Sequence, residues 1–132
     1  MIKIRVYGTP APQGSKKHVG RGRMVESSKI LPAWRKAIKE TIQAEYDGEP
    51  LDQPLSVEAD FFIPRPAKPM FDEPATPADL DKLLRALGDG MEAGGLVKND
   101  ARITHWNATK NYATDDFPPG VEIRVYEQGE NG

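Results

Sequence analysis

Three aspartates are the residues of this chain with the clearest capacity for chemistry. Asp79 and Asp81 stand two positions apart, and Asp100 follows Asp81 by nineteen positions. Two or three convergent carboxylates are common ligands of Mg²⁺ or Mn²⁺. Such ions activate water and neutralise charge on the phosphate during phosphodiester hydrolysis. The pattern therefore indicates metal-dependent hydrolysis of a phosphodiester, with Mg²⁺ as the expected cofactor and Mn²⁺ as a substitute.

The local backbone decides whether Asp79 and Asp81 can act together. Side chains at i and i+2 point to one side of an extended segment, but inside a helix they diverge by about 200°. The pair therefore requires a helix that begins near Asp81. The alternative is ordinary helix capping, in which Thr76 is the N-cap, Pro77 holds the first helical position and Asp79 the third, where the helix dipole favours an acid.

Arg85 lies one helical turn beyond Asp81. Its guanidinium could place positive charge on a phosphate at the same site, which makes it a candidate catalytic residue. The alternative is an exposed ion pair between Asp81 and Arg85, of the kind that stabilises many surface helices. Spacing alone does not decide whether Asp100 returns to this site.

Composition narrows the type of metal and the class of protein. The chain has 132 residues, no cysteine and two histidines, and 38% of it is apolar. Disulfides, thiolate catalysis and Cys-ligated zinc are excluded, so any metal must be held by oxygen ligands. No apolar run approaches the roughly 20 residues of a membrane-spanning helix. The N-terminus alternates charged and apolar residues and lacks the apolar core of a signal peptide, so we expect a cytoplasmic protein without a membrane partner or small-molecule cofactor.

The net charge of −2 hides a segregation of charge along the chain. Basic residues gather between residues 15 and 39 with Glu26 as the single acid, and most acids come later. A basic segment attracts phosphates, and an acidic pocket concentrates divalent metal. The alternative for the basic segment is a solvated loop. The candidate DNA-binding residues are Lys16, Lys17, Arg21, Arg23 and Lys82.

Hydrophobic periodicity predicts the elements that must position these residues. We expect strands at 2–7, 54–63, 102–112 and 120–127, and helices at about 29–46 and from about 77 to 93. Pro32 is expected in the first turn of the first helix. Flexible loops are expected at about 8–26 and 64–77, with a tail at 128–132. The order β-α-β-α-β-β predicts one α+β domain over residues 1–132, with a single mixed sheet of about four strands and two main helices.

Several other residues have a structural and a functional interpretation. Trp34 is expected in the core rather than as a base-stacking platform. Arg35, Lys36 and Lys39 are expected on the solvated face of the first helix. Asp60 is either an additional metal ligand or part of a polar sheet face.

At the aspartates the sequence resembles a known family. The segments Asp79-Leu80-Asp81-Lys82-Leu83-Leu84-Arg85 and Lys98-Asn99-Asp100-Ala101-Arg102-Ile103 resemble the RusA family of Holliday junction resolvases. That family has an Asp-Leu-Asp-Asn-Leu-x-Lys signature and an Asp-Asp-x-x-Val stretch at the same spacing. The similarity runs from about residue 1 to 126, and its specific part is confined to 79–103.

The resemblance implies a structure-specific endonuclease that resolves four-way DNA junctions with paired symmetric nicks in recombination and repair. It implies that Asp79, Asp81 and Asp100 are the catalytic, metal-binding carboxylates, and that Arg85 replaces a functionally important lysine. It also implies a homodimer, whose two-fold axis would match the opposed strands of branched DNA.

Three positions depart from the family pattern. Lys82 replaces an asparagine, Arg85 replaces a lysine, and Asn99 replaces the first acid of the Asp-Asp pair. None of these changes removes one of the three carboxylates. The alternatives are a non-catalytic junction-binding accessory protein, a general branched-DNA or flap nuclease, and an α+β scaffold without a DNA role.

Overall fold

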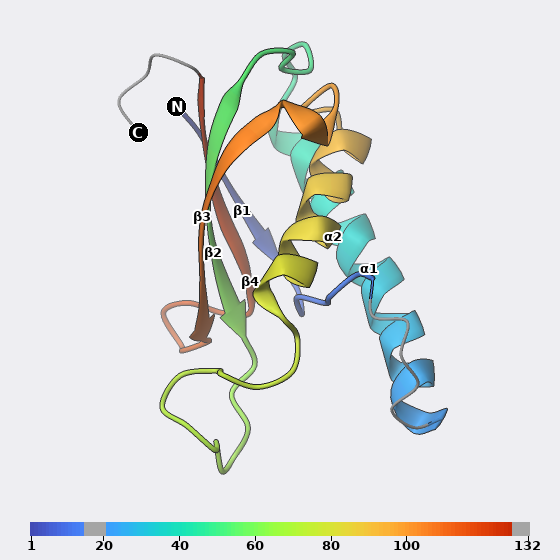
Figure 1. Cartoon of the computed structure of the whole chain (residues 1–132), viewed down its shortest axis with the longest axis vertical. Coiled ribbons are helices and arrows are strands. Elements are labelled where there is room, and N and C mark those ends of the chain that lie inside the picture. Colours follow the sequence, from blue (N-terminus) through green and yellow to red (C-terminus); the bar gives the residue numbers. More distant parts are fainter. Residues whose placement is uncertain (15–20, 128–132) are drawn as a thin grey trace.

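A four-stranded sheet carries two helices on one of its faces (Figure 1). The structure is a computed structural model that describes residues 1–14 and 21–127, with the backbone alone at 21–29. The elements in chain order are β1 (Ile2–Tyr7), α1 (Arg21–Glu45), β2 (Leu55–Ile63), α2 (Leu80–Ala93), a short 3₁₀ turn (Asp100–Arg102), β3 (Ile103–Tyr112) and β4 (Gly120–Glu127). The predicted α+β fold, its element order and its single mixed sheet are confirmed.

The strands lie in the order β1-β4-β2-β3. β4 is antiparallel to both β1 and β2, whereas β3 is parallel to β2. Parallel neighbours need a crossover connection, and α2 is that crossover. α2 therefore runs back along the sheet, and its C-terminal half lies near the start of β3, where Asp100 is found.

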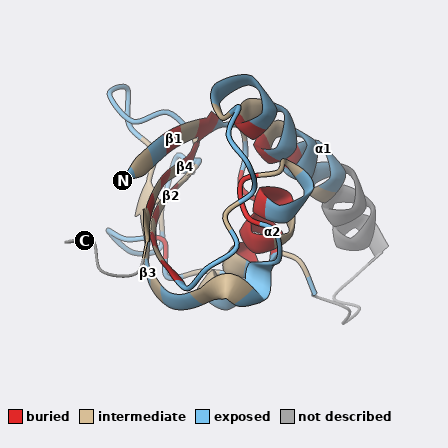
Figure 2. Ribbon diagram, turned by 90° about the horizontal axis from the view of Figure 1, so that it is seen from above, coloured by how far each residue is buried: buried red, intermediate tan, exposed pale blue. Residues whose placement is uncertain are grey.

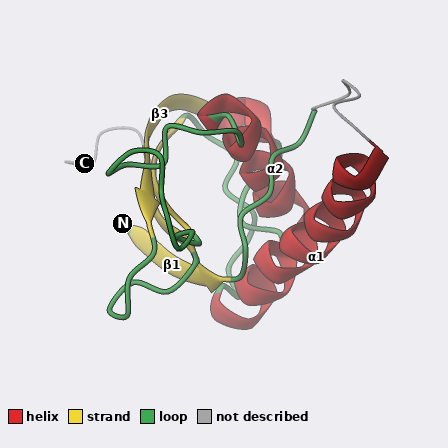
Figure 3. Cartoon of the chain, turned by 90° about the horizontal axis from the view of Figure 1, so that it is seen from below, coloured by secondary structure: helices red, strands yellow, loops and turns green. Residues whose placement is uncertain are grey.

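The buried residues of the sheet and the helices form one core (Figure 2), and both helices lie on one side of the sheet (Figure 3). Alternate residues of β2 are buried, as the period of a strand requires. Trp34 of α1 is only 1% exposed, so its predicted place in the core is confirmed. The helices contribute Ile38 and Ile42 from α1 and Leu83, Leu87 and Met91 from α2.

Two glycines, one inside α2 and one at its C-cap, allow the helices to pack closely. A Cβ added at Gly90 would lie 2.6 Å from Cγ2 of Ile38, and one added at Gly94 would lie 2.9 Å from Cβ of Ile42. Such distances are too short for any real side chain. Gly90 weakens the helix intrinsically by about 1 kcal/mol relative to alanine, and the burial of Ile38 against it offsets this cost.

Two predictions about the first helix were wrong. α1 begins at Arg21 and not near residue 29, so residues 21–26 are helical and not part of a loop. Pro32 therefore lies inside the helix and not in its first turn. A proline inside a helix lacks one hydrogen-bond donor and crowds the preceding turn, and Pro32 lies on the exposed side of α1.

Residues 64–79 contain no helix or strand, as predicted for residues 64–77. Within the described residues, neither helix combines the length and the apolar character needed to cross a membrane.

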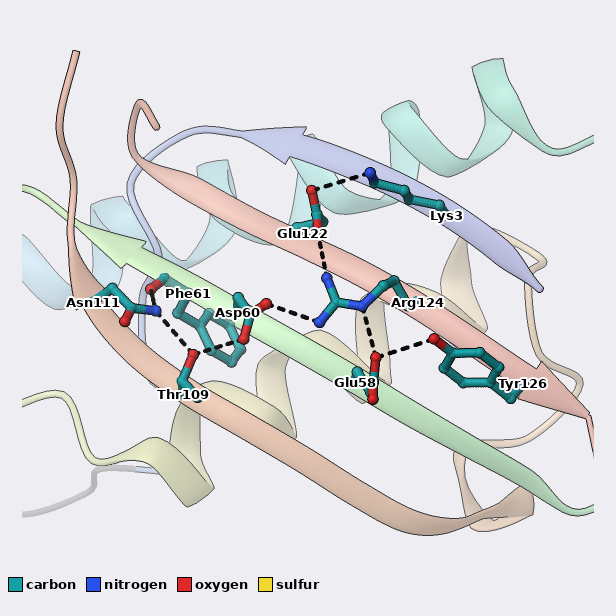
Figure 4. Close-up of polar contacts among 9 residues, drawn as sticks. All are labelled: Lys3, Glu58, Asp60, Phe61, Thr109, Asn111, Glu122, Arg124 and Tyr126. Atoms are coloured by element: carbon teal, nitrogen blue, oxygen red, sulfur yellow. Dashed lines mark hydrogen bonds and ion pairs between the residues drawn. The ribbon is translucent and has the colours of Figure 1, made fainter. Parts of the chain in front are cut away.

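The sheet face away from the helices carries a polar network centred on Arg124 (Figure 4). Its guanidinium donates to Glu58 Oε1 at 2.7 Å, to Asp60 Oδ2 at 2.9 Å and to Glu122. Asp60 also accepts from the hydroxyl of Thr109 at 2.7 Å. These contacts support the interpretation of Asp60 as part of a polar sheet face. The hydrogen bond from Arg124 lowers the pKa of Glu58, against the effect of desolvation.

We expect Arg124→Gln to reduce the free energy of unfolding at pH 7 by about 1–2 kcal/mol, because it leaves half-buried carboxylates without a cationic donor. The folded-state pKa of Glu58 lies below its unfolded value, so its contribution is present above that unfolded value and is lost as the pH falls through the folded pKa. Urea unfolding at pH 7 and pH 3 should therefore show a smaller difference between wild type and variant at pH 3.

The matched control is Lys3→Gln, which removes an exposed pair with Glu122 at 3.7 Å on the same sheet face. Its effect should stay within about 0.5 kcal/mol. Equal effects of the two substitutions would show that Arg124 contributes no more than an ordinary surface charge.

Candidate active site

An open hollow of about 340 Å³ lies between α2 and β3. α2 contributes residues spaced i, i+3, i+4 and i+7, which form one face of a helix. The 3₁₀ turn and β3 contribute the opposite wall. Two of the three predicted carboxylates therefore share this hollow with the predicted arginine. Its lining residues are Asp81, Leu84, Arg85, Gly88, Asp100 and Trp106.

The start of α2 meets the condition that the sequence set for the aspartate pair. The helix begins at Leu80, and Asp79 is the N-cap residue, with extended backbone at φ −60° and ψ 139°. The alternative in which Thr76 caps the helix is therefore wrong. The side chain of Asp79 makes no capping hydrogen bond, so its carboxylate is not used to hold the helix end.

The chain enters α2 through a strained residue. Ala78 has a φ of +94°, a conformation that alanine rarely adopts. Lys110 of β3 donates to the carbonyl oxygen of Thr76 at 3.0 Å and to that of Ala78 at 3.1 Å. β3 thus fixes the end of the proline-rich loop, and with it the position of Asp79.

Asp79 does not line the hollow. Its side chain is 64% exposed and pairs with Lys82, with Nζ and Oδ2 3.6 Å apart. Among the residues that the structure describes, no three carboxylates or histidines lie close enough together to hold one metal ion. The structure brings Asp81 and Asp100 to the same hollow, whereas Asp79 is outside its lining and pairs with Lys82.

Asp100 lies against the C-terminal half of α2. A Cβ added at Gly88 would lie 3.4 Å from Oδ2 of Asp100, so the glycine leaves room for this carboxylate. Gly88 comes seven residues after Asp81, about 10 Å along the helix axis, so Asp81 and Asp100 stand at two sides of the hollow. The backbone N–H of Asp100 donates to Glu92 Oε1 at 2.9 Å.

Negative charge is concentrated around Asp100. Partial burial raises the pKa of Asp100, and the carboxylates of Glu92 and Asp89 raise it further. The neighbouring Asn99 uses its side chain to accept from the N–H of Ala101 at 2.8 Å, and so caps the 3₁₀ turn. This end of the hollow therefore favours a cation.

The loop before α1 contacts α2 beside the hollow, and the sequence analysis did not predict this contact. The backbone N–H of Gln13 donates to the carbonyl oxygen of Lys82 at 3.0 Å, and its side-chain amide donates to Asp89. Gly14 has a φ of +96°, and a Cβ there would lie 2.1 Å from Nη1 of Arg85. The loop thus positions Asp89 and leaves space for the guanidinium of Arg85. The sequence feature that could have indicated this loop is the dipeptide Gln13-Gly14, which follows two prolines.

The remaining predicted residues divide into two groups. Lys16 and Lys17 lie outside the described residues, and Arg21 and Arg23 are described by their backbone alone, in the first turn of α1. Lys82 is described, and it lies beside Asp79 rather than in the hollow.

Comparison with known proteins identifies a family for almost the whole chain. Residues 7–126 match the family described as Endodeoxyribonuclease RusA. A relative from Aquifex aeolicus (strain VF5), named Crossover junction endodeoxyribonuclease RusA, is 23% identical over 126 residues, which cover 96% of this chain and 93% of the relative. The family match includes the hollow and the loop with Gln13 and Gly14.

We expect Gly14→Ala to displace the guanidinium of Arg85, because the added methyl group would occupy its place. The measurement is the NMR signal of the Arg85 Nε–H group, together with urea unfolding. The control is Gly95→Ala, which has a φ of +85° but open space around its Cβ. Both variants should lose roughly 1–2 kcal/mol through backbone strain, and only Gly14→Ala should shift the Arg85 signal. An unchanged signal in Gly14→Ala would remove the loop from the site.

Proposed function

The chain belongs to the RusA family of endodeoxyribonucleases, and we propose from this premise that it resolves four-way DNA junctions by metal-dependent hydrolysis. The products would be paired symmetric nicks in opposed strands, made during recombination and repair in the cytoplasm. The observation that carries the proposal is the meeting of Asp81, Arg85 and Asp100 around one open hollow. The hollow combines carboxylates that could bind a metal with a guanidinium that could bind a phosphate, and it is open to a large substrate.

Arg85 is the residue proposed to hold the scissile phosphate. It is exposed within the hollow and follows Asp81 by one helical turn. A guanidinium presents paired donors to phosphate oxygens, and a donor fixed in advance stabilises charge that develops during reaction. Because Gly14 has no side chain, the guanidinium of Arg85 can lie directly against its backbone, and this contact would keep the guanidinium in one place.

Asp81 and Asp100 are the residues proposed to hold one or two Mg²⁺ ions, with Mn²⁺ as a substitute. Asp79 is proposed as the third ligand, in exchange for its ion pair with Lys82. The donors are all oxygens, which suits a hard divalent cation. Burial raises the pKa of Asp100, and repulsion from Glu92 and Asp89 adds to it; a bound cation offsets such an accumulation of negative charge. When bound, Mg²⁺ would supply a water activated for attack on phosphorus.

The assembly proposed for this reaction is a homodimer. A four-way junction requires two matched nicks, and an isologous dimer presents two identical sites related by one two-fold axis. Lys16, Lys17, Arg21 and Arg23 are proposed to contact the phosphates of the junction arms, together with Lys82. Phosphate contacts of this kind make binding strongly dependent on salt.

A junction-binding accessory protein without catalysis is the second candidate. The observation in its favour is the pairing of Asp79 with Lys82, together with the lack of any three described carboxylates or histidines placed to hold one metal ion. It differs from the first candidate in one measurable respect, since it would bind a junction and leave all strands intact.

The decisive test is nicking of a labelled four-way junction with Mg²⁺ by wild type, Asp81→Asn and the control Asp115→Asn. We expect paired symmetric nicks from wild type and the control. Asp81→Asn should bind the junction and cut it slower by on the order of 100-fold or more. Binding without cutting by wild type would identify the accessory protein. Equal cutting of three-way and flap substrates would identify a general branched-DNA nuclease.

Metal binding can be measured without any reaction, by titrating Mn²⁺ and following its electron paramagnetic resonance signal. Affinity should fall in Asp81→Asn and Asp100→Asn and stay unchanged in Asp115→Asn. Lys82→Gln should raise the affinity, because it frees the carboxylate of Asp79 from a competing ammonium group. Wild-type affinity in both Asp81→Asn and Asp100→Asn would rule out these two residues as metal ligands.

A further inference from the structure

A second open hollow, of about 500 Å³, lies between α1 and α2. Arg35, Lys36 and Lys39 of α1 line it with one acid, Glu40, and α2 contributes only the small residues Gly90 and Ala93. The sequence predicted these cations on a solvated helix face. The structure adds that they surround a concave surface whose α2 lining contains no carboxylate. The α2 acid that pairs with one of them, Asp89, lies outside that lining.

Close packing of the helices limits the acidic partners that α2 can offer these cations. Gly90 must be glycine because its neighbour Ile38 leaves no room for a Cβ, so no acidic side chain can occupy that position. Within the described residues, the only ion pair of this cluster joins Arg35 Nη2 to Asp89 Oδ2, and its length is 4.0 Å. Lys36 and Lys39 are exposed and make no ion pair with any described carboxylate.

Asp89 connects this basic hollow to the candidate active site. Asp89 Oδ2 lies 4.0 Å from Arg35 Nη2, and the Asp89 carboxylate is close enough to Asp100 to add to the rise in pKa that burial causes there. The amide of Gln13 donates to the same Oδ2 atom, so Asp89 has contacts with residues of both hollows. A ligand that spans both would meet cations of α1 and then the acidic wall with Asp100.

We propose that the hollow lined by Arg35, Lys36 and Lys39 binds the phosphate backbone of a duplex DNA arm beside the scissile strand. The inference rests on the proposed function and adds the surface along which the arm runs. A duplex carries one negative charge per about 1.7 Å of its axis, so an arm presents several phosphates to such a surface. The far face of the sheet offers DNA less free positive charge, because Glu58, Asp60 and Glu122 already pair with Arg124 there (Figure 4).

The test is the salt dependence of junction binding by the full chain, in chelator so that no strand is cut. Lys36→Gln and Lys39→Gln should each reduce the slope of log K against log salt by about 0.9, and together by about 1.8. Lys3→Gln is the matched control, since it removes one exposed lysine from the opposite face of the sheet. It should leave the slope at the wild-type value. Thermal unfolding of each variant checks that the fold is intact.

Two results would overturn the inference. One is an unchanged slope in the double variant, and the other is an equal reduction in Lys3→Gln, which would reflect net charge alone. Wild-type nicking, assayed separately with Mg²⁺, distinguishes this failure from failure of the proposed function. If wild type does not nick but the slopes differ as expected, the hollow remains a DNA-binding surface and the resolvase proposal is withdrawn.

Discussion

Burial of one face of α2 against the sheet determines where the residues of the candidate site point. Leu83, Leu87 and Met91 are fully buried on that face, and at about 100° per residue their burial turns Asp81 and Arg85 outward. The parallel pairing of β2 and β3 then requires α2 to run back across the sheet. That direction brings Asp100, just before β3, to the C-terminal half of the helix. One packing interface and one strand pairing thus place two distant segments at the same hollow.

Electrostatics divides the molecule into regions that suit a polyanionic substrate. Cations of α1 lie beside α2, acids concentrate around Asp100, and the far sheet face carries carboxylates around Arg124. A net charge of −2 does not reveal this arrangement. Local charge governs how a phosphate chain approaches, because the field of exposed charges is screened beyond a Debye length of about 8–10 Å.

Sequence periodicity was sufficient to predict the strands, the α+β class and the core position of Trp34. It was also sufficient to state what Asp79 and Asp81 require, namely a helix that begins near them, and α2 begins at Leu80. It failed for α1, because Pro32 is compatible with a first turn and also with an exposed helix interior. It gave no indication of the contact between Gln13 and Asp89, which are 76 positions apart, since spacing along a chain reveals contacts only within one element.

Glycines show the same limit of local reasoning. By intrinsic propensity Gly88 and Gly90 weaken α2, and nothing in their sequence context indicates a compensating gain. In the structure Gly88 makes room for Asp100, and Gly90 admits Ile38. Each is required by a partner from a different element, so only the assembled fold explains its presence.

The ion pair between Asp79 and Lys82 keeps the Asp79 carboxylate from joining Asp81 and Asp100 as the proposed third oxygen ligand. The strength of this ion pair determines how easily the carboxylate could be released. An exposed pair contributes about 0–1 kcal/mol, and the Asp79 carboxylate is 64% exposed. The backbone of Asp79 is already extended at the helix N-cap, so a change of side-chain rotamer is enough to release the carboxylate. On the proposed function, Lys82 is therefore a weak competitor for the Asp79 carboxylate, because an exposed ion pair opposes its release with no more than about 1 kcal/mol.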